Sequence, residues 1–172
     1  ARPQRSLTNT GFADKNSSVI SGKDFNLHLS VGGAAPVNIT IPANSTLEGA
    51  KDAINAAKAG ISAQVIDSGM VGSPDRYKIM VTGQPGAANA FSLSSANASL
   101  QFDTDSITTD GDPATTLQKA TDAVVLVDGV SYTRNSNKIS DIVPGVTLNL
   151  LATTLGTSTV QLSRDTSSLK TK

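Results

Sequence analysis

The sequence predicts a mainly β fold of the β-rich α+β class, with one short helix at about residues 46–58. Short runs of alternating apolar and polar residues recur along the 172-residue chain, which is the pattern of half-buried strands. Serine, threonine, asparagine and glycine fill the stretches between these runs, as expected for turns between short strands. Only one segment places its apolar residues at helical spacing.

The first two strands are expected on either side of a glycine pair. Residues 25–31 and 37–41 both alternate between apolar and polar side chains. Gly32-Gly33 lies between them and is a turn signal, so these two segments are predicted to form a hairpin.

The predicted helix has start and stop signals at its two ends. Ser45 and Glu48 have the spacing of a capping box, in which Ser45 is the N-cap and the Glu48 carboxylate reaches back to it. Lys58 in the last turn complements the helix dipole, and Gly60 is placed to end the helix. The apolar face consists of Leu47, Ala50, Ile54 and Ala57.

Further strands are expected after the helix. Residues 61–65 and 77–82 alternate, which completes a strand–strand–helix–strand–strand unit. Two short strands are predicted around Phe91 to Leu93 and Leu100 to Phe102. After a polar, acidic loop at 103–116, strands are predicted at 123–127, 130–133, 146–150 and 160–162, the first two joined by an Asp128-Gly129 turn.

Composition excludes or disfavours several classes of protein. The 14 basic residues balance the 14 acidic ones, so the chain lacks the basic excess of a nucleic-acid binder and has no polybasic cluster for a membrane surface. With 3% aromatic residues and no tryptophan, a deep ligand pocket is disfavoured. The absence of cysteine argues against a small disulfide-stapled domain and suits a protein that leaves the cytoplasm unfolded and folds outside. No signal peptide is visible, and the apolar runs are too short to span a bilayer.

No catalytic, cofactor-binding or metal-binding residues are predicted. His28 is the only histidine and lies on the polar face of a predicted strand, without a nucleophile motif, so it is expected to be a surface residue. One histidine and no cysteine cannot make an ordinary zinc site. Four aspartates in the acidic loop suggest calcium, but their spacing does not match an EF-hand, and a solvated loop is the simpler interpretation; they are Asp103, Asp105, Asp110 and Asp112.

Two stretches resemble a known family. Residues 39–63, with the pair Ile54-Asn55, followed by residues 77–82, are similar to the flagellin hook IN motif. Residues 122–150, together with 160–165, look like the bacterial flagellar cap proteins (hook-associated protein 2) just before their leg helices. The resemblance covers nearly the whole chain and is weakest at residues 1–20 and 84–117.

This resemblance implies a head of two small β domains, one inserted in the other. Residues 1–19 and 118–166 would form a discontinuous leg-proximal domain, and residues 20–117 would form the inserted distal domain. Residues 167–172 would begin a leg segment. Because the chain has no sustained heptad pattern, the helical legs of the family are expected to be missing from this fragment.

The resemblance also implies a structural and assembly protein rather than an enzyme. The family forms a homo-oligomeric ring at the extracellular tip of the flagellum, where it holds exported flagellin and promotes its folding and polymerisation. The partners would be further copies of the chain, flagellin and other hook-associated proteins, with contacts expected from the polar loops 67–76 and 103–116. One alternative is a surface adhesin or carbohydrate-binding β domain with a host glycan as partner, although Tyr77 and Tyr132 are the only tyrosines that could stack on sugars. The second alternative is an enzyme, which would need a cluster of titratable residues that the sequence does not offer.

Overall fold

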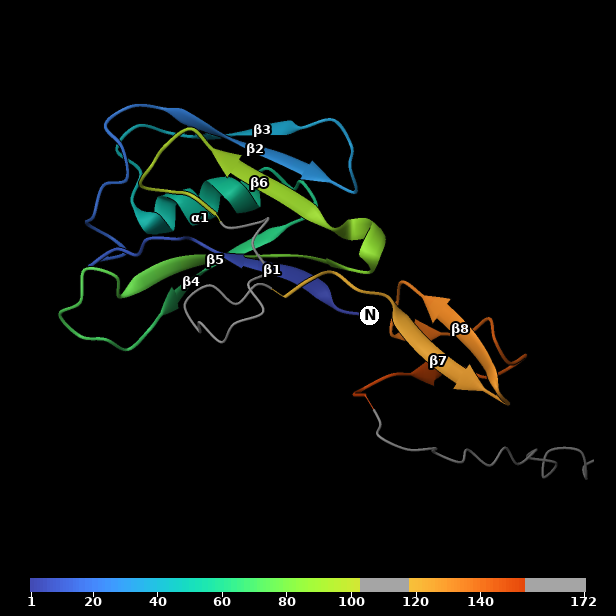
Figure 1. Cartoon of the computed structure of the whole chain (residues 1–172). Helices are drawn as coiled ribbons and strands as arrows, with labels where there is room; N and C mark the ends of the chain where they lie inside the picture. The colour runs from blue at the N-terminus through green and yellow to red at the C-terminus, as the bar shows by residue number, and fades with distance from the viewer. Residues whose placement is uncertain (103–117, 154–172) are drawn as a thin grey trace, which may run out of the picture.

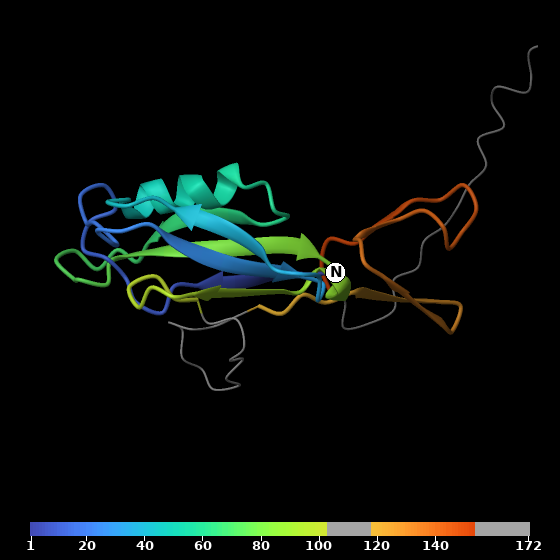
Figure 2. The ribbon, with the colours of Figure 1, turned by 90° about the horizontal axis from the view of Figure 1, so that it is seen from above.

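The computed structural model describes residues 1–102 and 118–153, which form two units (Figure 1). The larger unit, residues 1–102, contains two three-stranded sheets and one α-helix and is called the sandwich. The small unit, residues 118–153, contains two two-stranded sheets and extends from one end of the sandwich (Figure 2). The predicted mainly β class with a single short helix is therefore confirmed for the described residues.

Both sheets of the sandwich are open and antiparallel. The first has the strand order β3-β2-β6, and the second has the order β1-β5-β4. Their strands are β3 (Val37–Ile41), β2 (Phe25–Val31) and β6 (Phe91–Ser95) in the first sheet, and β1 (Pro3–Leu7), β5 (Tyr77–Pro85) and β4 (Ser62–Asp67) in the second.

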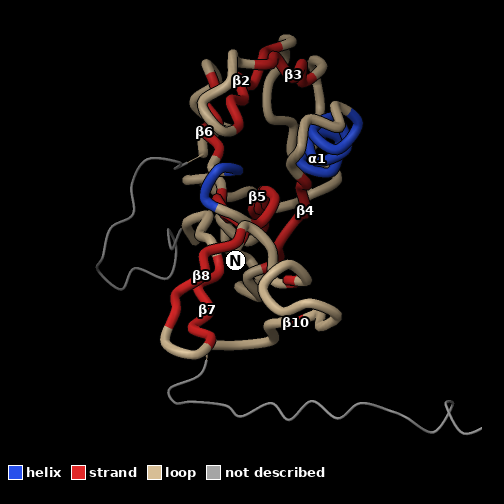
Figure 3. Tube along the Cα trace, turned by 90° about the vertical axis from the view of Figure 1, so that its right-hand side faces the viewer, coloured by secondary structure: helices blue, strands red, loops and turns tan. Residues whose placement is uncertain are grey.

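Helix α1 (Leu47–Ala56) packs beside β3 and β4, one edge strand from each sheet. It lies on one side of the sandwich, and β6 lies on the other side (Figure 3). The core fills the space between the two sheets and the helix, where removing apolar side chains from water provides the main driving force for folding. Its fully buried large residues are Leu27, Leu29, Ile41, Leu47, Ile54, Ile79, Val81, Leu93 and Leu100.

The start of α1 differs from the predicted capping box. Thr46, not Ser45, is the N-cap, and its Oγ1 accepts a hydrogen bond from the backbone N–H of Gly49 at 3.3 Å. The Ser45 hydroxyl instead donates to the carbonyl oxygen of Pro42 at 2.7 Å. The prediction was wrong by one residue because both hydroxyl side chains suit an N-cap, and the turn at Pro42 takes the first of them.

Two lysines explain why the Glu48 carboxylate does not complete a capping box. Glu48 forms ion pairs with Lys51 at 2.7 Å and with Lys15 at 3.3 Å, and the Lys51 ammonium lowers the pKa of the Glu48 carboxyl. At the other end, α1 stops at Ala56, before the predicted end. Lys58 has a positive φ of 49° and therefore lies outside the helix.

The predicted hairpin and the two strands after the helix are confirmed, but they belong to different sheets. β2 pairs with β3 in the first sheet, whereas β4 pairs with β5 in the second. The predicted strand at Leu100 to Phe102 was wrong. Both side chains are buried, yet the segment makes only an isolated bridge between Phe102 and Thr8, because it enters the core through a turn rather than along a sheet.

Strand β1 was not predicted, because its inward-facing residues are polar. Gln4, Ser6 and Thr8 are all buried, and β1 pairs antiparallel with β5. The first residues of the chain pair on both sides: Pro3–Leu7 with β5 of the sandwich, and Arg2 and Arg5 with Thr121 and Gln118. The predicted division of the chain into two domains stays a prediction.

The Gln4 amide connects the two sheets of the sandwich. Its Nε2 donates to the carbonyl oxygen of Phe91 at 2.7 Å, and its Oε1 accepts from the Phe91 N–H at 2.8 Å. Phe91 begins β6, an edge strand whose outward backbone groups would otherwise be available for pairing with another chain. The side chain of Gln4 therefore satisfies the backbone of an edge strand from the opposite sheet.

The small unit confirms the predicted Asp128-Gly129 hairpin. Both turn residues have positive φ, 51° and 81°, as a two-residue hairpin turn requires. β7 (Ala123–Val127) and β8 (Val130–Arg134) flank this turn. The strand predicted at 146–150 is shorter, since β10 (Leu148–Asn149) pairs with β9 (Lys138–Ile139) over two residues. The strand predicted at 160–162 lies outside the described residues.

Candidate functional site

The Ile-Asn pair at the end of α1 fastens the helix to the sandwich. Ile54 is 0% exposed in the core. The Asn55 amide donates through Nδ2 to the carbonyl oxygen of Ala63 at 2.9 Å, and its Oδ1 accepts from the Ala63 N–H at 2.8 Å. Since β4 is also an edge strand, Asn55 pairs with its backbone as Gln4 does with β6. The Ile-Asn pair therefore has a structural role, which is to hold α1 against the core and β4.

The loop of residues 67–76, called the distal loop, lies at the end of the sandwich far from the small unit (Figure 1). It connects β4 to β5 and is closed by two parallel hydrogen bonds from Arg76 to the Asp67 carboxylate, at 2.9 and 2.8 Å. Met70 and Val71 at its tip are 54% and 82% exposed. A closed loop that presents two apolar side chains loses less conformational freedom on binding than a free one.

A close approach to a neighbouring segment also supports the distal loop. The N–H of Gly11 donates to Asp75 Oδ1 at 2.8 Å. A Cβ at Gly11 would lie 2.6 Å from the backbone of Asp75, so only glycine fits there. Of the two predicted contact loops, this one is described, whereas residues 103–116 lie outside the described residues.

The ion pair of the distal loop predicts a dependence on pH. The Arg76 guanidinium, helped by the Gly69 N–H, lowers the pKa of Asp67 from 3.8 to about 2. Because the carboxyl pKa is lower in the folded chain, its contribution to stability is present above pH 3.8 and is lost as the pH falls toward 2. We expect carboxyl NMR titration to give this low pKa in the parent and a higher pKa in Arg76→Gln, still below 3.8 because the Gly69 N–H remains. Lys78→Gln, which removes a nearby charge that does not pair with Asp67, is the control; an equal change in both variants would contradict the assignment.

The small unit presents a second exposed apolar surface. Val124 and Leu126 point to the same face of β7 and are 67% and 70% exposed. Their partners on β8 are the exposed residues Thr133 and Ser131. This face and the tip of the distal loop lie on different units, so the chain carries two separate small apolar surfaces.

The residues considered for chemistry do not form a reactive cluster in the described part of the chain. His28 is exposed on β2, and its Nδ1 lies 2.6 Å from Asn38 Oδ1 on the neighbouring strand. No nucleophile or carboxylate is paired with it among the described contacts. Across residues 1–102 and 118–153, no three potential metal ligands come together. The four aspartates considered for calcium lie outside the described residues, and no described helix is long and apolar enough to cross a membrane.

The two tyrosines are covered by arginines. The Arg76 guanidinium lies 4.8 Å from the centroid of the Tyr77 ring, and that of Arg134 lies 5.9 Å from the Tyr132 ring. Each ring therefore has a cation on a face that would have to be free to stack on a sugar.

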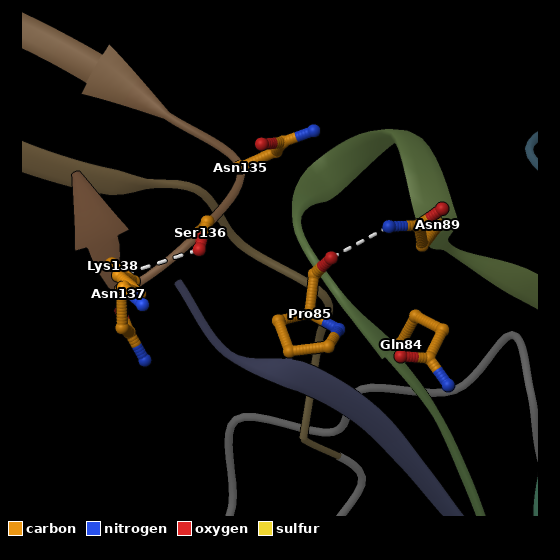
Figure 4. A pocket seen from close by; sticks show the side chains of 7 residues that line it. All are labelled: Gln84, Pro85, Asn89, Asn135, Ser136, Asn137 and Lys138. Carbon is orange, nitrogen blue, oxygen red and sulfur yellow. Dashed lines mark hydrogen bonds between the residues drawn. The ribbon is translucent and has the colours of Figure 1, made fainter. Parts of the chain in front are cut away.

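A cleft of about 570 Å³ lies where the two units meet (Figure 4). One wall comes from the end of β5 and the short 3₁₀ turn η1 (Ala87–Asn89), and the other comes from the segment between β8 and β9. Its lining offers amides, a hydroxyl and one ammonium group, which can form hydrogen bonds, but no histidine or carboxylate that could activate the hydroxyl. The lining residues are Gln84, Pro85, Asn89, Asn135, Ser136, Asn137 and Lys138.

Two family models match this chain, one in each of the two stretches that resemble a known family. The model of the flagellin hook IN motif matches residues 24–83. The model of the flagellar hook-associated protein 2 C-terminus matches residues 120–172. Both matches appear in the order that the sequence predicts.

A solved structure decides the family. The D2-D3 domains of the flagellar cap protein FliD from Escherichia coli are 32% identical, with a TM-score of 0.71 over 91% of this chain and 79% of theirs. The chain belongs to the flagellar hook-associated protein 2 family.

Other members of the hook-associated protein 2 family agree with this assignment. The protein from Escherichia coli O157:H7 is 35% identical over 145 residues, and the B-type protein from Pseudomonas aeruginosa is 33% identical over 161 residues. The FliD structure from Pseudomonas aeruginosa PAO1 gives a TM-score of 0.73 at 26% identity, over 99% of this chain and 78% of that one. The matches cover 80% and 84% of this chain but only 30% and 33% of the two full-length relatives.

Proposed function

We propose that this chain is the head region of a flagellar filament cap. In the longer protein, copies of the head would form a ring at the filament tip that holds flagellin and promotes its folding and polymerisation. The observation that carries the proposal is the likeness to the D2-D3 domains of the flagellar cap protein FliD, which extends over both units of the chain.

The surfaces of the two units suit a ring of weak contacts. A closed ring needs two different surfaces on each subunit, so that one subunit meets the next head to tail. The distal-loop tip and the exposed face of β7 are two such surfaces, and each presents only two strongly exposed apolar side chains. Small contacts of this kind can break and re-form while subunits are added.

The same proposal gives the partners and the location. Flagellin and other hook-associated proteins would be partners besides the chain itself, and the site of action would be extracellular, at the flagellum tip. The head would act by binding and positioning, without covalent chemistry. Strand pairing supports a distal domain of residues 3–102 and a leg-proximal domain that includes residues 118–153.

No observation favours the alternative of an adhesin or carbohydrate-binding domain. The matched relatives are named as hook-associated or cap proteins. An arginine lies over each tyrosine ring that could stack on a sugar.

Light scattering over a concentration series tests the proposal. The samples are this chain and a version extended at both ends by the flanking segments that full-length relatives carry. We expect a discrete ring-sized species for the extended protein and a monomer or weak association for this chain. An extended protein that stays monomeric at every concentration would overturn the ring.

A variant of the extended protein tests the proposed contact surface. We expect Met70→Ser with Val71→Ser to weaken the ring, because it removes the apolar tip of the distal loop. Val37→Ser, at a similarly exposed position on β3, is the matched control. If both variants assemble equally well, the distal loop is not a ring contact, although the ring itself would stand.

A further inference from the structure

The segment that leads into the small unit, residues 118–122, runs antiparallel beside the first residues of the sandwich. The N–H of Arg2 donates to the carbonyl oxygen of Thr121 at 2.7 Å, and the Thr121 N–H donates back at 3.0 Å. Nearby, the Arg5 N–H donates to the Gln118 carbonyl oxygen at 2.8 Å. Two paired segments alone form a ribbon that twists and bends readily. Such a pairing would leave the small unit free to swing, unless other contacts hold it.

Two side chains of the small unit also form hydrogen bonds with the backbone of the sandwich next to these paired segments. Asp122 Oδ1 accepts a hydrogen bond from the backbone N–H of Ala87 at 2.8 Å. Asn137 donates through Nδ2 to the carbonyl oxygen of Ala1 at 2.9 Å, and its Oδ1 accepts from the Ala1 nitrogen. Asn137 thus pairs with a backbone in the way that Gln4 and Asn55 do, but across the two units.

A third contact is a close approach of backbones. Gly86 has a φ of 102°, is buried, and donates its N–H to the Arg2 carbonyl oxygen at 3.4 Å. A Cβ at Gly86 would lie 2.9 Å from the Cβ of Asn135 and 3.0 Å from its carbonyl oxygen. Only a residue without a side chain lets the two units meet this closely.

We infer that these residues form a rigid joint that holds the sandwich and the small unit in one orientation. The joint consists of the pairing of residues 2–5 with residues 118–121 and of three further contacts. Together they connect two segments of the sandwich, residues 1–5 and 86–87, to two segments of the small unit, residues 118–122 and 135–137. Contacts at two segments of each unit oppose both bending and twisting, whereas a hinge leaves a few residues free to absorb the motion. The joint would fix the distal loop relative to the small unit whether or not the chain is part of a cap.

A distance measurement between the units tests the joint. The chain has no cysteine, so Ser94→Cys on β6 and Thr133→Cys on β8, both exposed, give two clean spin-label positions. We expect pulsed electron paramagnetic resonance to give one narrow distance distribution in this background. A distribution that is already broad before the joint is altered would overturn the inference.

Removing the side-chain contacts should release the small unit. With Asp122→Ala and Asn137→Ala together, the distance distribution should roughly double in width, while the melting temperature of the sandwich stays the same. Asp52→Ala with Asn9→Ala is the matched control, because it changes one exposed aspartate and one exposed asparagine that have no contact with the joint residues. Equal widths in the two double variants would overturn the joint.

Gly86→Ala tests the backbone contact separately and should shift the mean distance. Gly33→Ala is its control, because Gly33 also has a positive φ, 74°, but has open space around it. A shift of equal size in both variants, or in neither, would count against the close approach. If Gly86→Ala fails to fold, the double variant Asp122→Ala with Asn137→Ala still tests the joint.

Discussion

Replacing Ile54 with alanine should lower the free energy of unfolding by about 2–5 kcal/mol. Ile54 is fully buried between the two sheets, so truncation leaves a cavity that the helix and strands cannot close completely. Urea denaturation followed by circular dichroism would measure the change as a lower midpoint with an unchanged slope. A loss of this size would show that Ile54 stabilises the core, which is a structural role rather than a contact with another protein.

Val71→Ala is the control for Ile54→Ala, since it removes the same kind of side chain from an exposed position. It should change the free energy of unfolding by less than about 0.5 kcal/mol. If the two variants were equally stable, α1 would not be fastened to the core through Ile54.

Replacing Gln4 with alanine should lower the free energy of unfolding by about 2–4 kcal/mol, because both the N–H and the carbonyl oxygen of Phe91 lose their partner in a buried place. Gln4→Met retains most of the side-chain volume and should show a similar loss, which would separate the hydrogen bonds from packing. Both changes are measured by urea denaturation.

Gln64→Ala, on an exposed position of β4, is the matched control for Gln4→Ala and should be nearly neutral. If Gln4→Ala and Gln64→Ala lowered the free energy of unfolding by the same small amount, water would be replacing the Gln4 amide as the partner of Phe91. In that case the connection between the two sheets would not depend on this side chain.

The strands that the sequence predicted are those with an apolar face. Alternation located β2 to β6 because burying one face of a strand leaves that pattern in the sequence, whereas an apolar run and the Asp128-Gly129 turn located β7 and β8. β1 has no such pattern, since its inward residues Gln4, Ser6 and Thr8 are polar. Their burial depends on partners far along the chain, which no local pattern records.

The position of the helix cap shows a second limit. Ser45 and Thr46 are neighbours with equivalent hydroxyl groups, and both suit an N-cap. The choice is made by contacts outside the helix, at the Pro42 carbonyl and the lysine partners of Glu48. The sequence could therefore place the helix, but not its first residue.

The candidate surfaces were harder to predict than the fold. The loop 67–76 could be proposed as a contact segment from its composition and from the resemblance to a family. That Met70 and Val71 are exposed, and that Asp67 and Arg76 close the loop, depends on the three-dimensional structure. The joint also escaped prediction, because its glycine and amide residues look like ordinary turn residues in the sequence.

The pairing of β1 with β5 has a consequence for the order in which the chain can fold. Leu7 pairs with Met80, and Arg2 pairs with Thr121, so the N-terminal strand can meet its neighbours only after residues more than 70 positions along the chain are available. Contacts between distant residues slow folding, because a long loop must close before they add stability. When the chain emerges N-terminus first, the hairpin of β2 and β3 can form early, whereas β1 must wait with its edge unpaired. We therefore expect β1 to join the second sheet after β4 and β5 have paired, and to be exposed to mispairing while it waits.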